Sequence, residues 1–131
     1  CDMARHNIFG KQGEDVAADY LIKNGYIIRE RNWRLDKLEV DIVAEKDRCI
    51  VMVEVKTRSY DVQSALLAVD KRKQSFLIRA ANAYVKSLEF AYSVRVDVIC
   101  VVGDGPDNFR IDHIPDAVRP RVRAVRGRRI K

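Results

Sequence analysis

The chain has 131 residues, 47% of them hydrophobic, and a formal net charge of +6, which together suit one compact domain with a hydrophobic core. No apolar run approaches the roughly 20 residues of a membrane-spanning helix, and the first residues lack the apolar segment of a secretory signal, so we expect a cytoplasmic protein without a membrane partner. The three cysteines are scattered and form no CxxC pair, which favours reduced thiols over a disulfide framework or a zinc site.

The first half of the chain predicts one helix and three strands. Residues 13–24 have apolar side chains at the spacing of one helix face, and the Asn-Gly pair at 24–25 is a typical C-terminal cap. Residues 26–35, 39–45 and 49–57 have strand character and are joined by a tight turn at 36–37 and by the polar residues 46–48. Because the connections are this short, the three strands should form an antiparallel meander.

The second half predicts a long helix and two more strands. Residues 70–89 repeat apolar side chains with helical spacing. Residues 94–102 are apolar on both faces, which is typical of a strand inside a sheet, and residues 108–114 form a short strand that we expect at an edge. The order α-β-β-β-α-β-β predicts an α/β fold with a mixed central sheet flanked by helices.

The positive charge is concentrated at the C-terminus. Residues 119–131 contain seven basic and no acidic side chains, whereas residues 1–118 sum to −1. We therefore predict a single domain over residues 1–118 and a basic, flexible tail over residues 119–131. Such a tail is either a solubilising end or a contact for nucleic acid, and its charge alone does not decide between them.

Two charged residues interrupt the apolar third strand, "CIVMVEVKTR". Side chains alternate along a strand, so Glu54 and Lys56 share one face and lie ~6.5 Å apart. The preceding strand carries a second acid, Asp41, among apolar neighbours. In a hairpin, residues at nearly equal distances from the turn meet, so Asp41 and Glu54 should lie close together.

Two carboxylates that meet in a partly apolar site repel each other, and a bound divalent cation would relieve the repulsion. Mg²⁺ is typically held by one or two carboxylates and keeps several waters. A neighbouring lysine can orient or deprotonate a water for phosphodiester hydrolysis, which is the role that Lys56 suggests. Glu14 falls inside the apolar arc of the first helix and is a further candidate for this site. The alternative interpretation of Glu54 and Lys56 is an ordinary ion pair at the end of a strand.

The order of these motifs resembles a known group of enzymes. Glu14, then "EVDIVA" with Asp41, then "VEVKTR" with Glu54 and Lys56 is similar to the PD-(D/E)XK nuclease superfamily. Within it, "GEDVAADYLIKNGYIIRERNWR", "LEVDIVA", "VEVKTR" and a later "HI" resemble the YraN-like family of bacterial proteins, which is similar to archaeal Holliday junction resolvases. The resemblance covers residues 13–117 and leaves out the tail.

The resemblance implies the restriction-endonuclease-like fold. It also implies that Asp41, Glu54 and Glu14 bind Mg²⁺ or Mn²⁺, and that Lys56 is the catalytic lysine. Leu38 stands where the family commonly has glycine, and residues 59–69 contain no glycine although the family loop commonly does. Both departures lie beside the expected site, and neither removes a ligand.

Four further residues are candidates for contacts with nucleic-acid phosphates: Arg34, Arg58, Lys73 and Gln74. Lys73 and Gln74 lie at the start of the long helix, in line with its apolar stripe, so they would point toward the sheet. The alternatives are surface charge for the two arginines and a solvated helix turn for the other two, and we favour these alternatives.

Three other features receive structural interpretations. Trp33 has the opposite strand parity to Arg34 and should pack in the core. Asp97, inside the strand 94–102, is interpreted as a hydrogen-bonded structural acid. His6 and His113 are isolated in the sequence and are assigned no metal role.

The sequence therefore predicts a metal-dependent nuclease that hydrolyses nucleic-acid phosphodiester bonds. DNA is favoured as the substrate, including branched or otherwise structured DNA, and a homodimer would suit the cutting of two strands. One alternative is a module of the same fold that binds nucleic acid without cutting it. The other is a protein-interaction subunit whose acidic residues are structural.

Overall fold

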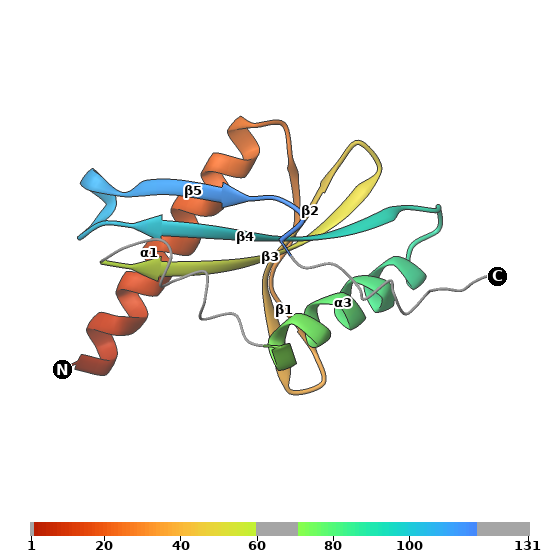
Figure 1. The fold of residues 1–131 in the computed structure, drawn as a ribbon, viewed down its shortest axis with the longest axis horizontal. Helices are drawn as coiled ribbons and strands as arrows, with labels where there is room; N and C mark the ends of the chain where they lie inside the picture. The colour runs from red at the N-terminus through yellow and green to blue at the C-terminus, as the bar shows by residue number, and fades with distance from the viewer. Residues whose placement is uncertain (1, 60–70, 118–131) are drawn as a thin grey trace.

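A computed structural model describes residues 2–59 and 71–117, with side chains from Ile8 onward (Figure 1). Its elements are α1 (Asp2–Lys23), β1 (Ile27–Leu35), β2 (Leu38–Lys46), β3 (Cys49–Arg58), α3 (Lys71–Lys86), β4 (Ser93–Val102), the short 3₁₀ helix η1 (Pro106–Asn108) and β5 (Arg110–Ile114). The order α-β-β-β-α-β-β is the predicted one. The fold is mixed α/β, with a central sheet flanked by helices, and is consistent with a restriction-endonuclease-like fold.

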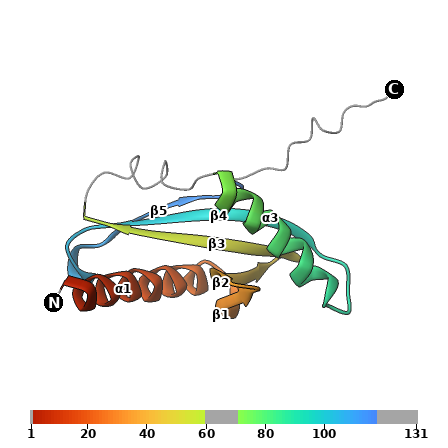
Figure 2. The ribbon, with the colours of Figure 1, turned by 90° about the horizontal axis from the view of Figure 1, so that it is seen from below.

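The sheet has five strands in the order β1-β2-β3-β4-β5. The first three strands are antiparallel neighbours, which confirms the predicted meander, and β4 pairs parallel to β3 and antiparallel to β5. In Figure 2, α1 lies on one side of the sheet and α3 on the other. The predictions that β4 lies inside the sheet and β5 at its edge are both confirmed.

The alternation of β3 divides the hydrophobic core between the two helices. Val51 and Val53 face α1 and pack with its buried residue Leu21. Ile50 and Met52 face α3 and pack with Leu77 and other residues of that helix. Glu54 continues the face of Ile50 and Met52, so the sheet places this carboxylate on the α3 side, beyond the end of the apolar core.

The β2–β3 hairpin has a tight turn that fixes its register. Asp47 and Arg48 both have positive φ angles, of 52° and 61°, as a two-residue type I′ turn requires. Pairing runs from Lys46 opposite Cys49 to Ile42 opposite Val53 and stops there. The next position would place Asp41 opposite Glu54, which is the neighbourhood that hairpin symmetry predicts.

The β1–β2 pair bends where it leaves β3. Asn32 has a φ of 52°, a left-handed conformation, inside β1, and it lies between the paired residues Arg31 and Trp33. On β2, Val40 packs on the α3 side whereas Ile42 packs on the α1 side, so the simple alternation is interrupted between them. The hairpin end therefore turns away from β3 and exposes part of the β3 edge (Figure 1).

Two predicted boundaries differ from the structure by three residues or more. α1 begins at Asp2, whereas the sequence indicated a start at residue 13, because residues 2–12 carry no continuous apolar stripe from which the helix could be recognised. α3 ends at Lys86, three residues before the prediction, where the Ser87 hydroxyl donates to the Tyr84 carbonyl at 2.6 Å. None of the helices that the structure describes is long and apolar enough to cross a membrane. The predicted tail, 119–131, lies outside the described residues.

Candidate active site

Asp41 takes the place of a neighbouring strand at the exposed edge of β3. Its carboxylate oxygen Oδ2 accepts a hydrogen bond of 2.8 Å from the backbone N–H of Val55. A partly buried N–H without a partner would cost free energy, so this bond satisfies the backbone group that β2 leaves when it diverges. The side chain is therefore held at a fixed position beside Glu54.

The charge of Asp41 is unfavourable in this position. Burial is the main cause that raises the pKa of Asp41 to about 7, and the charge of Glu54 is the second cause. The charge of Glu14 raises this pKa further, whereas the Val55 hydrogen bond and the charge of Lys73 lower it. The structure thus brings together the three acidic groups that the sequence singled out, closely enough to influence one another.

Glu54 is buried, with 5% of its surface exposed, and two lysines approach it. Its Oε2 lies 3.0 Å from Lys56 Nζ, and its Oε1 lies 3.5 Å from Lys73 Nζ. The second contact is an ion pair whose geometry is not that of a hydrogen bond, so Oε1 is a buried oxygen without a hydrogen-bond partner in the described structure. A buried acceptor without a hydrogen bond is uncommon, and a water or an ion would satisfy it in addition to the charge of Lys73.

Lys73 belongs to the site, and the interpretation of its helix turn as solvated is wrong for this residue. Besides the contact with Glu54, its Nζ donates to the Glu39 carbonyl at 3.0 Å and lies 5.5 Å from the ring centre of Phe76. The signal was present in the sequence, because Lys73 continues the apolar stripe of α3. Gln74, the next residue, is half-buried in the same turn.

Glu14 reaches the site because α1 approaches β3 closely. Gly13 is buried against Thr57, and a Cβ at this position would overlap the Thr57 side chain. The neighbouring Glu14 accepts a hydrogen bond of 3.2 Å from Asn32 Nδ2, and its Oε1 lies 3.8 Å from Arg31 Nη2. The side chains of β1 thus orient Glu14 from one side.

A cavity of about 470 Å³ opens between α1 and the end of β3. Its walls include Phe9, Glu14, Lys56 and Arg58. Lys56 borders both this cavity and Glu54, so it connects the open space with the carboxylates. Of the two predicted arginine contacts, Arg58 lies on the cavity wall, whereas Arg34 is an exposed residue near the end of β1 and is not part of that wall.

The residues present fit a hard divalent cation held by few protein ligands. The described part of the chain has no group of three or more His, Cys, Asp or Glu side chains arranged to hold a metal ion. Asp41 and Glu54 nevertheless supply two carboxylates, and within residues 2–59 and 71–117 no group donates a hydrogen bond to Glu54 Oε1. Mg²⁺ is commonly bound by one or two carboxylates with retained waters, whereas structural zinc requires four nitrogen or sulfur ligands.

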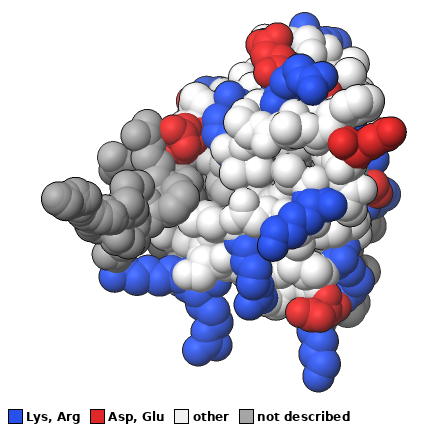
Figure 3. Space-filling view, turned by 90° about the vertical axis from the view of Figure 1, so that its right-hand side faces the viewer, with Lys and Arg blue, Asp and Glu red and all other residues white. Residues whose placement is uncertain are grey.

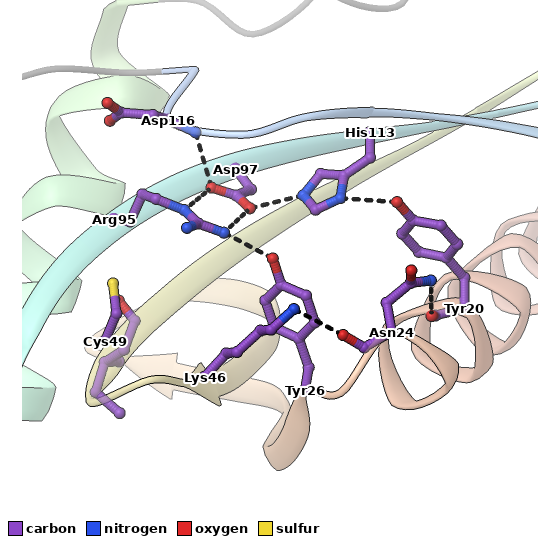
Figure 4. Close-up of polar contacts among 10 residues, drawn as sticks. Tyr20, Asn24, Tyr26, Lys46, Cys49, Arg95, Asp97, His113 and Asp116 are labelled. Atoms are coloured by element: carbon purple, nitrogen blue, oxygen red, sulfur yellow. Dashed lines mark hydrogen bonds and ion pairs between the residues drawn. The ribbon is translucent and has the colours of Figure 1, made fainter.

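A second polar cluster surrounds Asp97, and the sequence predicted only part of it. Asp97 is fully buried and hydrogen-bonded, as predicted, but His113 is not isolated, because its Nε2 lies 2.7 Å from Asp97 Oδ2 and its Nδ1 lies 3.0 Å from the Tyr20 hydroxyl (Figure 4). Arg95 Nη2 donates to both Asp97 and the Tyr26 hydroxyl at 2.8 Å. The cluster ties α1 to β4 and β5, the elements behind the site. Trp33 packs edge-on against Tyr84, as predicted for a core residue.

Comparison with known proteins gives consistent matches over most of the chain. A model of the uncharacterised protein family UPF0102 matches residues 13–101, a range that includes Glu14, Asp41, Glu54 and Lys56. A UPF0102 protein of Bacteroides thetaiotaomicron is 49% identical over 119 residues, covering 90% of this chain and 98% of that protein. UPF0102 proteins of Flavobacterium johnsoniae and Parabacteroides distasonis are 45% and 41% identical, covering 88% of this chain and 97% and 95% of theirs.

Proposed function

Because the chain belongs to the uncharacterised protein family UPF0102, whose description names no activity, its own side chains must indicate its chemistry, and we propose that it is a metal-dependent nuclease. It hydrolyses phosphodiester bonds of nucleic acid, with DNA, including branched DNA, as the favoured substrate and Mg²⁺ or Mn²⁺ as the cofactor. It acts in the cytoplasm. The proposal agrees with the resemblance to PD-(D/E)XK nucleases and rests on the arrangement of Asp41, Glu54 and Lys56.

The observation that carries the proposal is the buried oxygen of Glu54 beside Asp41. Glu54 Oε1 receives no hydrogen bond from the described residues, and the charge of Glu54 helps to hold the pKa of Asp41 near 7. Both conditions are unfavourable in the protein alone, and a divalent cation between the carboxylates would relieve both. The Val55 hydrogen bond and the two lysine ion pairs stabilise part of this arrangement, but they supply no hydrogen bond to Oε1 among the described residues.

Each side chain has a distinct task. Asp41 and Glu54 would hold the cation, which when bound would acidify a water and withdraw charge from the phosphate. Lys56, fixed by its ion pair with Glu54 and facing the cavity, positions the attacking water and offers its charge to the phosphate. Arg58 on the cavity wall binds a phosphate oxygen of the substrate. Glu14 extends the acidic side of the site from α1.

A cleavage assay tests the proposal. Linear, flapped and four-way-junction DNA, together with RNA, are incubated with Mg²⁺, with Mn²⁺ and with EDTA. We expect cleavage of at least one DNA with metal and none with EDTA. Absence of cleavage from the whole panel, by protein whose folding has been verified by circular dichroism, would refute the nuclease assignment.

One observation favours a second candidate, a module that binds nucleic acid without cutting it. Glu54 already has two lysines within 3.5 Å, so part of its charge is compensated without metal. In that case oligonucleotide binding would be salt-sensitive and unaffected by EDTA, and no substrate would be cut. The cleavage panel and a binding titration together separate the two functions.

A further inference from the structure

Helix α3 carries an unusual distribution of charge. Among its 16 residues, five are basic and none is acidic. Arg72, Arg79 and Lys86 are seven residues apart, which places them in one row along the helix, and all three are exposed. None of the ion pairs between described residues involves these three side chains.

The row begins beside the candidate active site. Lys73, next to Arg72 in the first turn of α3, contacts Glu54, while Arg72 itself points outward. The helix then runs away from the site toward the right-hand end of the molecule in Figure 1. Figure 3 views that end directly, and Lys and Arg side chains gather over the lower part of this face.

The row of Arg72, Arg79 and Lys86 ends near a group of aromatic side chains that contact an arginine. Phe90 and Tyr92 follow α3 directly, and the guanidinium of Arg48 lies 5.8 Å and 5.4 Å from their ring centres. The backbone N–H of Ser93 donates to the Arg48 carbonyl at 3.1 Å and fixes this connection against the β2–β3 turn. Phe90 remains 59% exposed although it is large and apolar.

The dimensions suit a short single strand. A 16-residue helix is about 24 Å long. A single strand that keeps the stacked duplex rise of about 3.4 Å per nucleotide spans this length with about seven nucleotides, and a more extended strand spans it with fewer. Basic side chains in a row match a polyanion, and an exposed aromatic ring beside an arginine provides a surface on which an unpaired base stacks. A paired base inside a duplex cannot offer its face to Phe90.

We propose that the outer face of α3 binds a single-stranded arm of the substrate, which runs from the active site along Arg72, Arg79 and Lys86 to a base stacked on Phe90. The choice of nucleic acid as the ligand rests on the proposed nuclease function. On this basis the path of one nucleic-acid strand outside the cavity, and the preferred class of substrate, are both defined. Substrates with an unpaired arm of about seven nucleotides bind best.

Binding of oligonucleotides in EDTA tests this surface without any cutting. The probes are oligothymidylates of about 4 and about 12 nucleotides, shorter and longer than the row, and a blunt duplex of about 12 base pairs. The double variant Arg79→Ala/Lys86→Ala should lower the log–log salt slope by about 1.4 for the long probe, at about 0.7 per single-strand phosphate. The short probe is too short to run from Arg72 to Phe90, so it should bind the parent protein more weakly than the long probe does. A matched control, Lys23→Ala/Arg110→Ala, removes two exposed basic side chains from α1 and β5 and should leave the long-probe slope unchanged.

A second variant tests the stacking position. Phe90→Ala should weaken binding of the long single strand by about tenfold and leave the duplex unaffected. The control Ile27→Ala removes another exposed apolar side chain, 61% exposed on β1, and should change neither.

Three results would overturn the inference: equal slope losses in the α3 variant and its control, equal losses for single strand and duplex, or unchanged binding by Phe90→Ala. Because binding is measured without metal, these results are independent of cleavage. Cleavage with unchanged α3 binding would refute the inference alone, and α3 binding without cleavage would refute the nuclease function alone.

Discussion

Replacing Asp97 with asparagine tests whether the polar cluster behind the site holds the fold together. The carboxylate accepts four hydrogen bonds at 2.7 to 2.9 Å, two from Arg95 and one each from His113 and the Asp116 backbone. Asp97 is fully buried. The asparagine side chain has one acceptor oxygen only, and its NH₂ group would face N–H groups that also donate. At least one hydrogen bond would therefore be replaced by a repulsive contact between two buried donors.

The expected cost follows from these contacts. Breaking a buried, hydrogen-bonded ion pair by removing one partner typically costs about 3–5 kcal/mol. Domains of this size unfold in urea with a slope of about 1–3 kcal/mol per M, so the urea midpoint of Asp97→Asn should fall by about 2 M. Unfolding is followed by far-ultraviolet circular dichroism at pH 7, where the carboxylate is ionised.

An exposed pair provides the control for this measurement. Asp112 pairs with Arg110 at 3.3 Å, and their side chains are 43% and 64% exposed. Surface pairs contribute about 0–1 kcal/mol, so Asp112→Asn should hardly move the midpoint. If Asp97→Asn costs no more than Asp112→Asn, the cluster does not stabilise the fold and our reasoning is wrong.

The cluster also predicts a pH dependence. Burial by itself would raise the pKa of Asp97, but the hydrogen bonds from His113, Arg95 and the Asp116 N–H outweigh it and lower the pKa. A carboxylate with a lowered pKa stabilises the folded state above its unfolded pKa of about 3.9, and this stabilisation is lost as the pH falls through the lower folded value. The difference in stability between the parent and Asp97→Asn should therefore be full at pH 7 and shrink on acidification. A difference that grows in acid contradicts the assignment.

Four further predictions concern the site and the tail. Glu54→Gln should abolish metal-dependent cleavage and keep or tighten nucleic-acid binding in a gel-shift assay, because one negative charge is removed. Lys56→Ala should lose cleavage but still bind Mn²⁺ in calorimetry, and cutting at the parent rate would disprove the assignment of this lysine. Gly13→Ala should destabilise the protein by about 1–3 kcal/mol in thermal unfolding through overlap with β3, whereas Gly10→Ala, with open space around it, should not. Removal of residues 119–131 should reduce the salt slope of duplex binding by about three units, if half of its seven basic side chains contact phosphates; an unchanged slope would leave the tail a solubilising end only.

The meeting of Asp41 and Glu54 could be predicted because it depends on local geometry. Side chains alternate along a strand, and a short turn fixes which residues of a hairpin face each other. The turn at Asp47 and Arg48 is one residue shorter than the predicted connection, and the register that it sets still brings the two acids together. The strand order depends on short connections and one helical crossover, so it could be predicted for the same reason.

The contacts that the sequence did not reveal join elements far apart in the chain. Lys73 lies 19 residues after Glu54, and although its place in the apolar stripe indicates that it faces the sheet, the residue that it contacts there depends on how α3 packs. The link between Tyr20 and His113 spans 93 residues and exists only because α1 crosses the sheet beneath β5. Periodicity indicates which face of an element is buried and leaves open which other element covers it.

The divergence of β2 from β3 is the feature that turns this sheet into a site. Had β2 continued alongside β3, a backbone carbonyl would have paired with the Val55 N–H, and the Asp41 carboxylate would have had no free N–H to bond at this edge. The left-handed conformation of Asn32 bends the hairpin instead, and the Asp41 carboxylate takes the free N–H at 2.8 Å. Asp41 therefore has both a structural bond through one oxygen and an unfavourable charge beside Glu54. At this strand edge two carboxylates therefore lie together, and Lys56 connects them with the cavity, which is the arrangement that the proposed metal-dependent hydrolysis would use.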